Sequence, residues 1–115
     1  MSITTQSTNF QVNEEVQWEQ AGPGILRQVC GYDDKIMLVK ARFEKGAVGA
    51  LHEHFQSQVT YVESGVFECS INGEKKILNA GDGFYVPPHV IHGCVCMEPG
   101  MLIDVFSPMR EDFLK

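Results

Sequence analysis

The sequence predicts an all-β fold, either a sandwich or a closed barrel built from short strands. Short apolar and β-branched runs recur from position 25 onward, and turn-forming residues rich in Gly, Pro, Asn and Asp separate them. Helical periodicity is absent until the last few residues. Closure suits a chain of 115 residues, because a barrel removes exposed strand edges and leaves a cavity in the middle.

The first elements are expected to be irregular, and strands come after them. Residues 1–9 are polar and predict a frayed lead-in. Residues 14–20 allow at most one helical turn or an edge strand, and residues 21–24 form a turn. The strongest hairpin signal is Asn72-Gly73, because both residues tolerate the positive φ of a type I′ turn. Strands are predicted at 25–30, 36–43, 58–62, 66–71, 76–78, 84–86, 89–96 and 101–106.

The length predicts one domain, with a lead-in and first strands at 1–35 and a barrel core at 36–115. A net charge of -6 argues against a nucleic-acid partner, which would require a basic stripe. No stretch reaches transmembrane length, and the N-terminus does not resemble a signal peptide, so we expect no membrane partner and a cytoplasmic protein. The four cysteines are expected to be small buried hydrophobes or one chance ligand rather than a disulfide scaffold.

The histidines form the most informative pattern. His52 and His54 share one face of a strand, and Gln58 falls on the same parity. His92 follows forty residues after His52, beyond a glycine–proline corner. Three imidazoles and an amide oxygen would hold a divalent transition metal and leave a coordination position open. The alternative is that these are surface or loop histidines, and His89 is itself interpreted as a rim or surface residue.

Two segments resemble the motifs of the cupin superfamily. Residues 46–65 match the first motif, with Gln58 where Glu is usual. Residues 81–96 match the second, with His89 in place of Gly and Cys96 in place of Asn. The resemblance implies a single-domain double-stranded β-helix, which is a jelly-roll barrel, here with a short C-terminal extension. Since this superfamily hosts many chemistries, the motifs alone do not specify the reaction.

The replacement of Glu by Gln58 favours a particular kind of metal chemistry. A neutral amide ligand leaves the full double charge of the metal uncompensated, which suits Lewis-acid work on an anionic ligand better than dioxygen activation. We therefore expect one divalent transition metal as cofactor. Nickel, zinc, iron and manganese all accept this ligand set, and the sequence does not distinguish them.

The C-terminal segment 100–114 is similar to the ending of KdgF-type cupins, which are pectin- and alginate-degradation proteins, and the whole resemblance spans about 36–114. It implies linearisation of 4,5-unsaturated monouronates to open-chain keto-uronates. The implied partner is thus a small anionic sugar. By the same resemblance, the metal ligands are His52, His54, Gln58 and His92, and the cavity residues are Asp104, Phe106 and Arg110.

The residues themselves support this mapping. Asp104 and Phe106 share a parity on the last strand, and an acid among apolar neighbours is costly unless it faces a polar cavity. Arg110 is expected to pair with the substrate carboxylate, the alternative being a solvated arginine paired with a neighbouring acid. Phe106 suits either core packing or a platform for a sugar ring. Gln56 shares the ligand parity and is expected to bind the sugar.

In the expected mechanism Asp104 acts as general acid and base, and Arg110 neutralises the carboxylate. Two alternatives remain: another metal cupin enzyme such as an iron dioxygenase, and a non-catalytic sugar- or ligand-binding cupin. Cys94 and Cys96 continue the inward parity of His92 and are expected to line the cavity. A homodimer is implied by resemblance, with edge strands and the face of Ile103 and Val105 as candidate interfaces.

Overall fold

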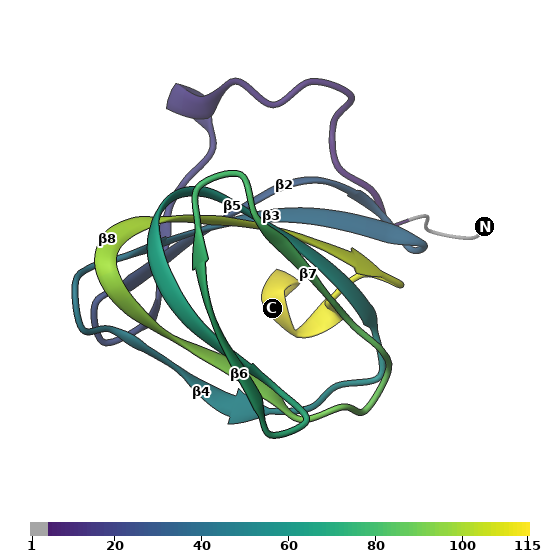
Figure 1. Cartoon of the computed structure of the whole chain (residues 1–115). Helices are drawn as coiled ribbons and strands as arrows, with labels where there is room; N and C mark the ends of the chain where they lie inside the picture. The colour runs from purple at the N-terminus through teal and green to yellow at the C-terminus, as the bar shows by residue number, and fades with distance from the viewer. Residues whose placement is uncertain (1–4) are drawn as a thin grey trace.

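The computed structural model describes residues 5–115, which contain eight β-strands and two short 3₁₀ helices (Figure 1). In chain order they are η1 (Asn13–Glu15), β1 (Glu19–Gly22), β2 (Ile25–Asp33), β3 (Ile36–Phe43), β4 (Val48–His52), β5 (Ser57–Ile71), β6 (Glu74–Asn79), β7 (Gly83–Val86), β8 (His92–Ser107) and η2 (Glu111–Leu114). None of the helices within this range is long and apolar enough to cross a bilayer. The predicted all-β class is confirmed.

The two longest strands, β5 and β8, pair antiparallel along most of their length and bend together to form the barrel (Figure 1). The first part of β5 pairs with β7 and its second part with β6. The first part of β8 pairs with β4, and its second part continues through β3 and β2 to β1. Two curved walls therefore face each other across a common interior, as the barrel prediction required.

Two of the predicted strand breaks are bends inside continuous strands. The break at 64–65 lies within β5, and the break at 99–100 lies opposite it within β8. A Cβ on Gly65 would lie 2.7 Å from the carbonyl oxygen of Glu98 and from Cα of Gly100. Only glycine allows the two backbones to approach so closely, so these residues bend the strands rather than end them. The prediction of separate strands here was wrong.

The strand predicted to begin at residue 89 begins instead at His92. His89 has φ of 62°, a left-handed conformation in the turn before the strand. This explains why glycine is usual at that position of the motif, since glycine adopts positive φ without steric cost. The hairpin between β5 and β6 forms as predicted, with φ of 50° at Asn72 and 84° at Gly73.

The described part of the N-terminal segment is attached to β2, contrary to the predicted frayed lead-in. The backbone N–H of Ser7 donates to Tyr32, and the Ser7 hydroxyl accepts from the Tyr32 N–H. Gln28 is fully buried beneath this segment, where its amide donates to the backbone carbonyls of Asn13 and Val16. A buried amide with several partners anchors the segment to the outside of the barrel.

Two clusters of apolar side chains fill much of the interior, and a cavity is left around the polar ones. One cluster includes Phe43, Val62, Phe67 and Leu102, and Phe43 packs edge-on against Phe67 at 5.2 Å between ring centroids. A second cluster of Met37, Val39, Phe106 and Met109 packs against the C-terminal helix η2. Between these clusters lies the cavity that holds the candidate site.

Candidate active site

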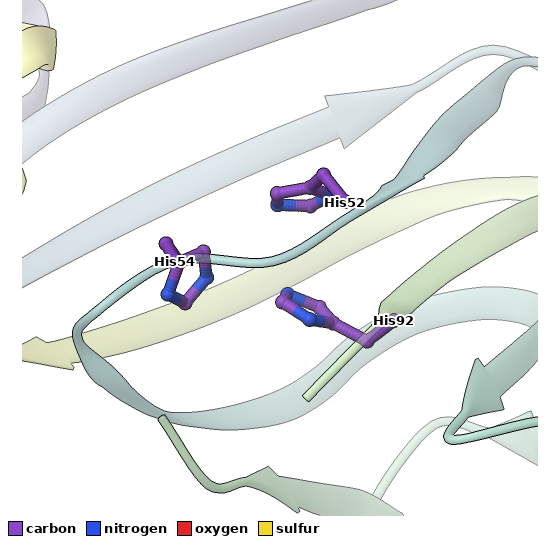
Figure 2. A group of neighbouring side chains, drawn as sticks. All are labelled: His52, His54 and His92. Carbon is purple, nitrogen blue, oxygen red and sulfur yellow. The ribbon is translucent and has the colours of Figure 1, made fainter. Parts of the chain in front are cut away.

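Three histidines from separate parts of the chain converge on one point (Figure 2). His52 ends β4, His54 lies in the following loop, and His92 begins β8 directly opposite His52 in the sheet register. One potential ligand atom from each lies within 4.8 Å of the others. The prediction that His52 and His54 share a strand face was wrong for His54, because β4 ends at His52, and it is the loop after β4 that brings His54 beside His92.

The hydrogen bonds of the three rings determine which nitrogen is left free. In each ring Nδ1 contacts a backbone carbonyl two residues away, at 2.8 Å for His52, 3.0 Å for His54 and 2.9 Å for His92. In the tautomer that donates from Nδ1 to these carbonyls, Nε2 keeps its lone pair and is free to bind a metal ion. Backbone carbonyls commonly orient metal-binding imidazoles in this way.

Gln58 adds a fourth acceptor to the same point. Its Oε1 lies 3.0 Å from Nε2 of His54 and 3.2 Å from Nε2 of His92. Its orientation is fixed because the amide Nε2 donates to the Thr60 hydroxyl at 2.8 Å and toward Asp104 at 3.4 Å. Three imidazole lone pairs and an amide oxygen therefore converge, an arrangement that a cation stabilises. The donor set fits the divalent transition metal predicted for it.

Burial favours the neutral form of His54 and His92. Desolvation, with smaller contributions from the neighbouring histidines and Arg110, lowers the pKa of His92 to about 4, although its hydrogen bond to the carbonyl of Val90 acts in the opposite direction. The pKa of His54 is also lowered, mainly by desolvation and then by the charge of Arg110. Neutral imidazole is the form that binds metal, so His54 and His92 are ready to bind an ion at neutral pH without first losing a proton.

Asp104 lies beside this group of acceptors and is linked to it through Thr60. The Thr60 hydroxyl donates to Oδ1 of Asp104 at 2.6 Å and accepts from the Gln58 amide. Desolvation in the barrel raises the pKa of Asp104 to about 6, opposed by Thr60, Arg110 and Gln58. The inward parity predicted for this acid is confirmed. Without a metal ion, its pKa lies close to neutrality rather than in the usual acidic range.

A cavity of about 470 Å³ connects these groups. Its wall includes His52, Gln58, His92, Asp104, Phe106 and Arg110. Such a volume is in the range of small-molecule sites. The polar residues are thus presented to a space that admits a ligand, rather than being buried against one another.

The sequence left two interpretations of Arg110, a cavity residue that binds the substrate carboxylate or a solvated arginine paired with a neighbouring acid, and the structure has features of both. Its Nε and Nη2 donate to the carboxylate of Asp112, at 3.1 Å and 3.0 Å. Its side chain is nevertheless only 13% exposed and lines the cavity. The guanidinium carbon lies 5.2 Å from the ring centre of Phe106, which is itself both buried core and cavity wall. The expected carboxylate contact must therefore use the edge of the guanidinium that Asp112 leaves free.

Other expected residues are placed differently. Gln56 donates to the backbone carbonyl of Met109 at 3.0 Å and does not belong to the cavity wall, so its expected contact with a sugar stays a prediction. Cys94 lines the cavity as expected, whereas Cys96 is packed into the apolar core. His89 is exposed and lies 3.4 Å from the carboxylate of Glu53, which agrees with its interpretation as a rim residue.

Two polar residues of this region were missed by sequence reasoning. Thr60 looks like an ordinary strand threonine, and only the fold places it between Gln58 and Asp104. Arg27 lies on β2 and lines the cavity together with Arg110. Arg27 could have been found from the sequence, because it shares the strand parity of Ile25 and Val29, and this parity predicts an inward-facing side chain.

The barrel and its converging histidines define a class of protein, and comparison with known proteins agrees. The family model described as "Cupin domain" matches residues 39–106. The chain belongs to the cupin family, and within it to the KdgF-type proteins. The curated "Pectin degradation protein KdgF" of Dickeya dadantii (strain 3937) is 44% identical over 105 residues, which cover 90% of this chain and 96% of that protein.

Two solved structures are similar over almost the whole chain. An RmlC-like cupin from Shewanella frigidimarina NCIMB 400 superposes with a TM-score of 0.92 at 50% identity, covering 94% of this chain and 97% of that chain. The structure of KdgF from Halomonas sp. superposes with a TM-score of 0.88 at 40% identity, covering 93% of this chain and 99% of that chain. The predicted cupin fold is therefore confirmed.

Proposed function

We propose that this protein is a metal-dependent enzyme that linearises 4,5-unsaturated monouronates derived from pectin or alginate. The observation that carries the proposal is the combination in one cavity of four converging acceptors, the carboxyl group of Asp104 and the guanidinium of Arg110. The similarity to proteins named KdgF supports the choice of substrate. The reaction is an isomerisation: the ring opens and the product tautomerises to an open-chain keto-uronate.

His52, His54, Gln58 and His92 would hold the metal ion. When bound, a divalent ion would supply positive charge that stabilises the negative charge developing on the substrate oxygens. The four ligands are neutral, so they leave that charge uncompensated. An anionic sugar is thus attracted to the cavity despite the net charge of -6 on the whole chain.

Asp104 would move the proton. It accepts the proton of the C1 hydroxyl while the bond between C1 and the ring oxygen breaks, giving an aldehyde at C1. The electron pair of that bond stays on the former ring oxygen, which is now attached to C5 as an enolate. Asp104 then delivers the proton to C4, and C5 becomes a ketone. Beside a bound divalent ion this carboxylate stays ionised near neutral pH, so it is able to accept the proton of the C1 hydroxyl and then return it.

Arg110 and Phe106 would orient the substrate. Asp112 and the face of Phe106 hold the guanidinium of Arg110 in the cavity wall, so its free edge is fixed before the substrate arrives. A preorganised guanidinium recognises a carboxylate with little loss of entropy. The ring of Phe106 lies 5.7 Å from that of His54 and offers an apolar surface beside the candidate metal ligands.

The test is the ultraviolet absorbance of the conjugated double bond, followed with and without protein for substrates derived from galacturonate and from mannuronate. Acceleration above the spontaneous reaction, with no oxygen consumed, is the expected result. Oxygen uptake under iron loading would instead indicate a dioxygenase. Binding of the sugar without acceleration would leave a ligand-binding cupin.

We also propose that the protein forms a homodimer through the outer face of β3, β8, β5 and β7. Outward-facing side chains in neighbouring register positions form an apolar surface there. Val59, Tyr61 and Tyr85 are each at least 50% exposed. Ile103 and Val105 on β8 lie between β5 and β3. Lys40 and Arg42 lie at the β3 side of this surface, and Glu63 extends it along β5. In a two-fold dimer the basic border of one copy can lie against the acidic border of the other, which suits an interface with a second copy.

A further inference from the structure

We propose that Arg27 is a second anion-binding residue of the cavity, which holds the carboxylate of a uronate together with Arg110. The inference deepens the proposed function and rests on its substrate class. Residue 27 pairs with Glu19 on β1 and with Ala41 on β3, and its side chain is turned toward the interior on the parity of buried Ile25. It lines the same cavity as His52, Gln58, Asp104 and Arg110.

One aromatic ring joins the two arginines. The guanidinium carbon of Arg27 lies 3.9 Å from the ring centre of Phe113, and that of Arg110 lies 4.3 Å from the same centre. Phe113 is placed by helix η2 and contacts Phe106 edge-on at 5.8 Å between centroids. Each guanidinium already has one carboxylate partner, Arg27 with Glu19 and Arg110 with Asp112, and the shared ring brings both cations to the same part of the cavity wall.

The hydrogen bonds of both guanidinium groups leave donors for such a ligand. Arg27 uses Nε to donate to Glu19 at 2.7 Å, and the described residues accept no hydrogen bond from its two terminal amino groups. Arg110 uses Nε and Nη2 for Asp112, and the described residues accept no hydrogen bond from its Nη1. The terminal amino groups of Arg27 therefore add donors to those that the remaining edge of Arg110 offers to a substrate carboxylate.

Burial makes these donors effective. The side chain of Arg27 is 23% exposed and that of Arg110 is 13% exposed, so neither is a freely solvated surface arginine. Charge-assisted hydrogen bonds in such partly enclosed sites are stronger than those at open surfaces. The site therefore selects a carboxylate over a neutral hydroxyl group at the same place on the sugar.

The experiment is calorimetric titration of the zinc-loaded full-length protein with D-galacturonate and with D-galactose, which lacks the carboxylate. The wild type is expected to bind galacturonate more tightly than galactose by at least about tenfold. Arg27→Gln should weaken galacturonate binding by about tenfold and leave galactose binding unchanged, and Arg27→Lys should restore part of the loss. The control is Lys45→Gln, since Lys45 is an exposed cation paired with Glu98 outside the cavity.

Three results would overturn the proposal: no preference of the wild type for galacturonate, unchanged galacturonate binding by Arg27→Gln, or an equal loss of both sugars in that variant. The last would indicate a purely structural role. These results are separate from the fate of the proposed function. If the protein selects galacturonate through Arg27 but does not accelerate linearisation, the proposed reaction is refuted and the anion site stands.

Discussion

The side-chain oxygen Oε1 of Gln58 lies 3.0 Å from Nε2 of His54. In the tautomer of His54 that donates from Nδ1 to the carbonyl of Gln56, no proton lies between these two atoms, so two acceptors face each other. The amide of Gln58 is turned away toward Thr60. Such an arrangement is unfavourable by itself and becomes favourable when a cation binds between the acceptors. Gln58 and the histidines around it therefore form a site that an ion completes.

Metal binding is expected to stabilise the fold. An ion at a concentration of 100 times its Kd adds about 2.7 kcal/mol, which corresponds to a rise in Tm on the order of 10 °C for a domain of this size. Differential scanning calorimetry with and without a chelator measures this shift. His54→Ala should abolish most of it. His89→Ala is the matched control, because His89 is exposed and paired with Glu53 at the rim. An equal loss of the shift in both variants would contradict the assignment.

The identity of the fourth ligand is tested by Gln58→Glu. A carboxylate at this position adds a negative charge to the acceptors, so metal affinity should rise by at least about tenfold. The same change removes the amide that donates to Thr60 and places a like charge near Asp104, which raises the pKa of that acid further. Turnover should fall by tenfold or more. Competition with a metal-sensitive dye reports the affinity, and weaker metal binding would argue against Gln58 as a ligand.

Acid stability depends on two buried groups of opposite effect. The pKa of His92 is about 4 in the folded protein and near 6.5 when unfolded, so the unfolded state binds more protons between these values and acid destabilises the fold. The pKa of Asp104 is about 6 when folded and near 3.8 when unfolded, so the folded state binds more protons in its window and acid stabilises the fold. In the metal-free wild type these two effects oppose each other, and the lowered pKa of His54 adds to the destabilisation by acid.

Removing the carboxyl group of Asp104 should reveal the destabilisation by acid that comes from His92. Between pH 6.5 and pH 4.5, metal-free Asp104→Asn is expected to lose about 2 kcal/mol more unfolding free energy than the metal-free wild type. Urea titrations at the two pH values measure the difference. Parallel losses in the two proteins would show that Asp104 does not have a raised pKa in the folded state.

The fold was predictable because its determinants are local. Strand alternation, the hairpin at Asn72-Gly73 and the spacing of the histidines are all properties of short segments. The continuity of β5 and β8 could not be predicted, because the bend at Gly65 is recognised only when Gly100 lies against it. The same limit applies to the site. Arg27 reaches the cavity from a distant strand, and Gln56 makes a backbone contact that parity cannot predict.

The outer sheet face is tested by placing a charge in its middle. Tyr61 is half exposed, so Tyr61→Glu should leave the fold intact and convert a dimer to a monomer. Sedimentation equilibrium gives the mass of each protein. A comparable charge on the opposite wall, Ile77→Glu on exposed β6, serves as the control and should leave the mass unchanged. A monomeric wild type, or a Tyr61→Glu variant that remains dimeric, would refute this interface.

The proposed proton transfer is tested most directly by the turnover of Asp104→Asn, with its metal content measured in the same sample. Asparagine keeps the shape of the side chain and removes the group that transfers the proton. We expect the metal-loaded wild type to accelerate loss of the unsaturated-uronate absorbance, whereas the variant retains the metal and reduces the enzymatic rate by at least about 100-fold. A variant that holds the metal and turns over at the wild-type rate would contradict the role of Asp104.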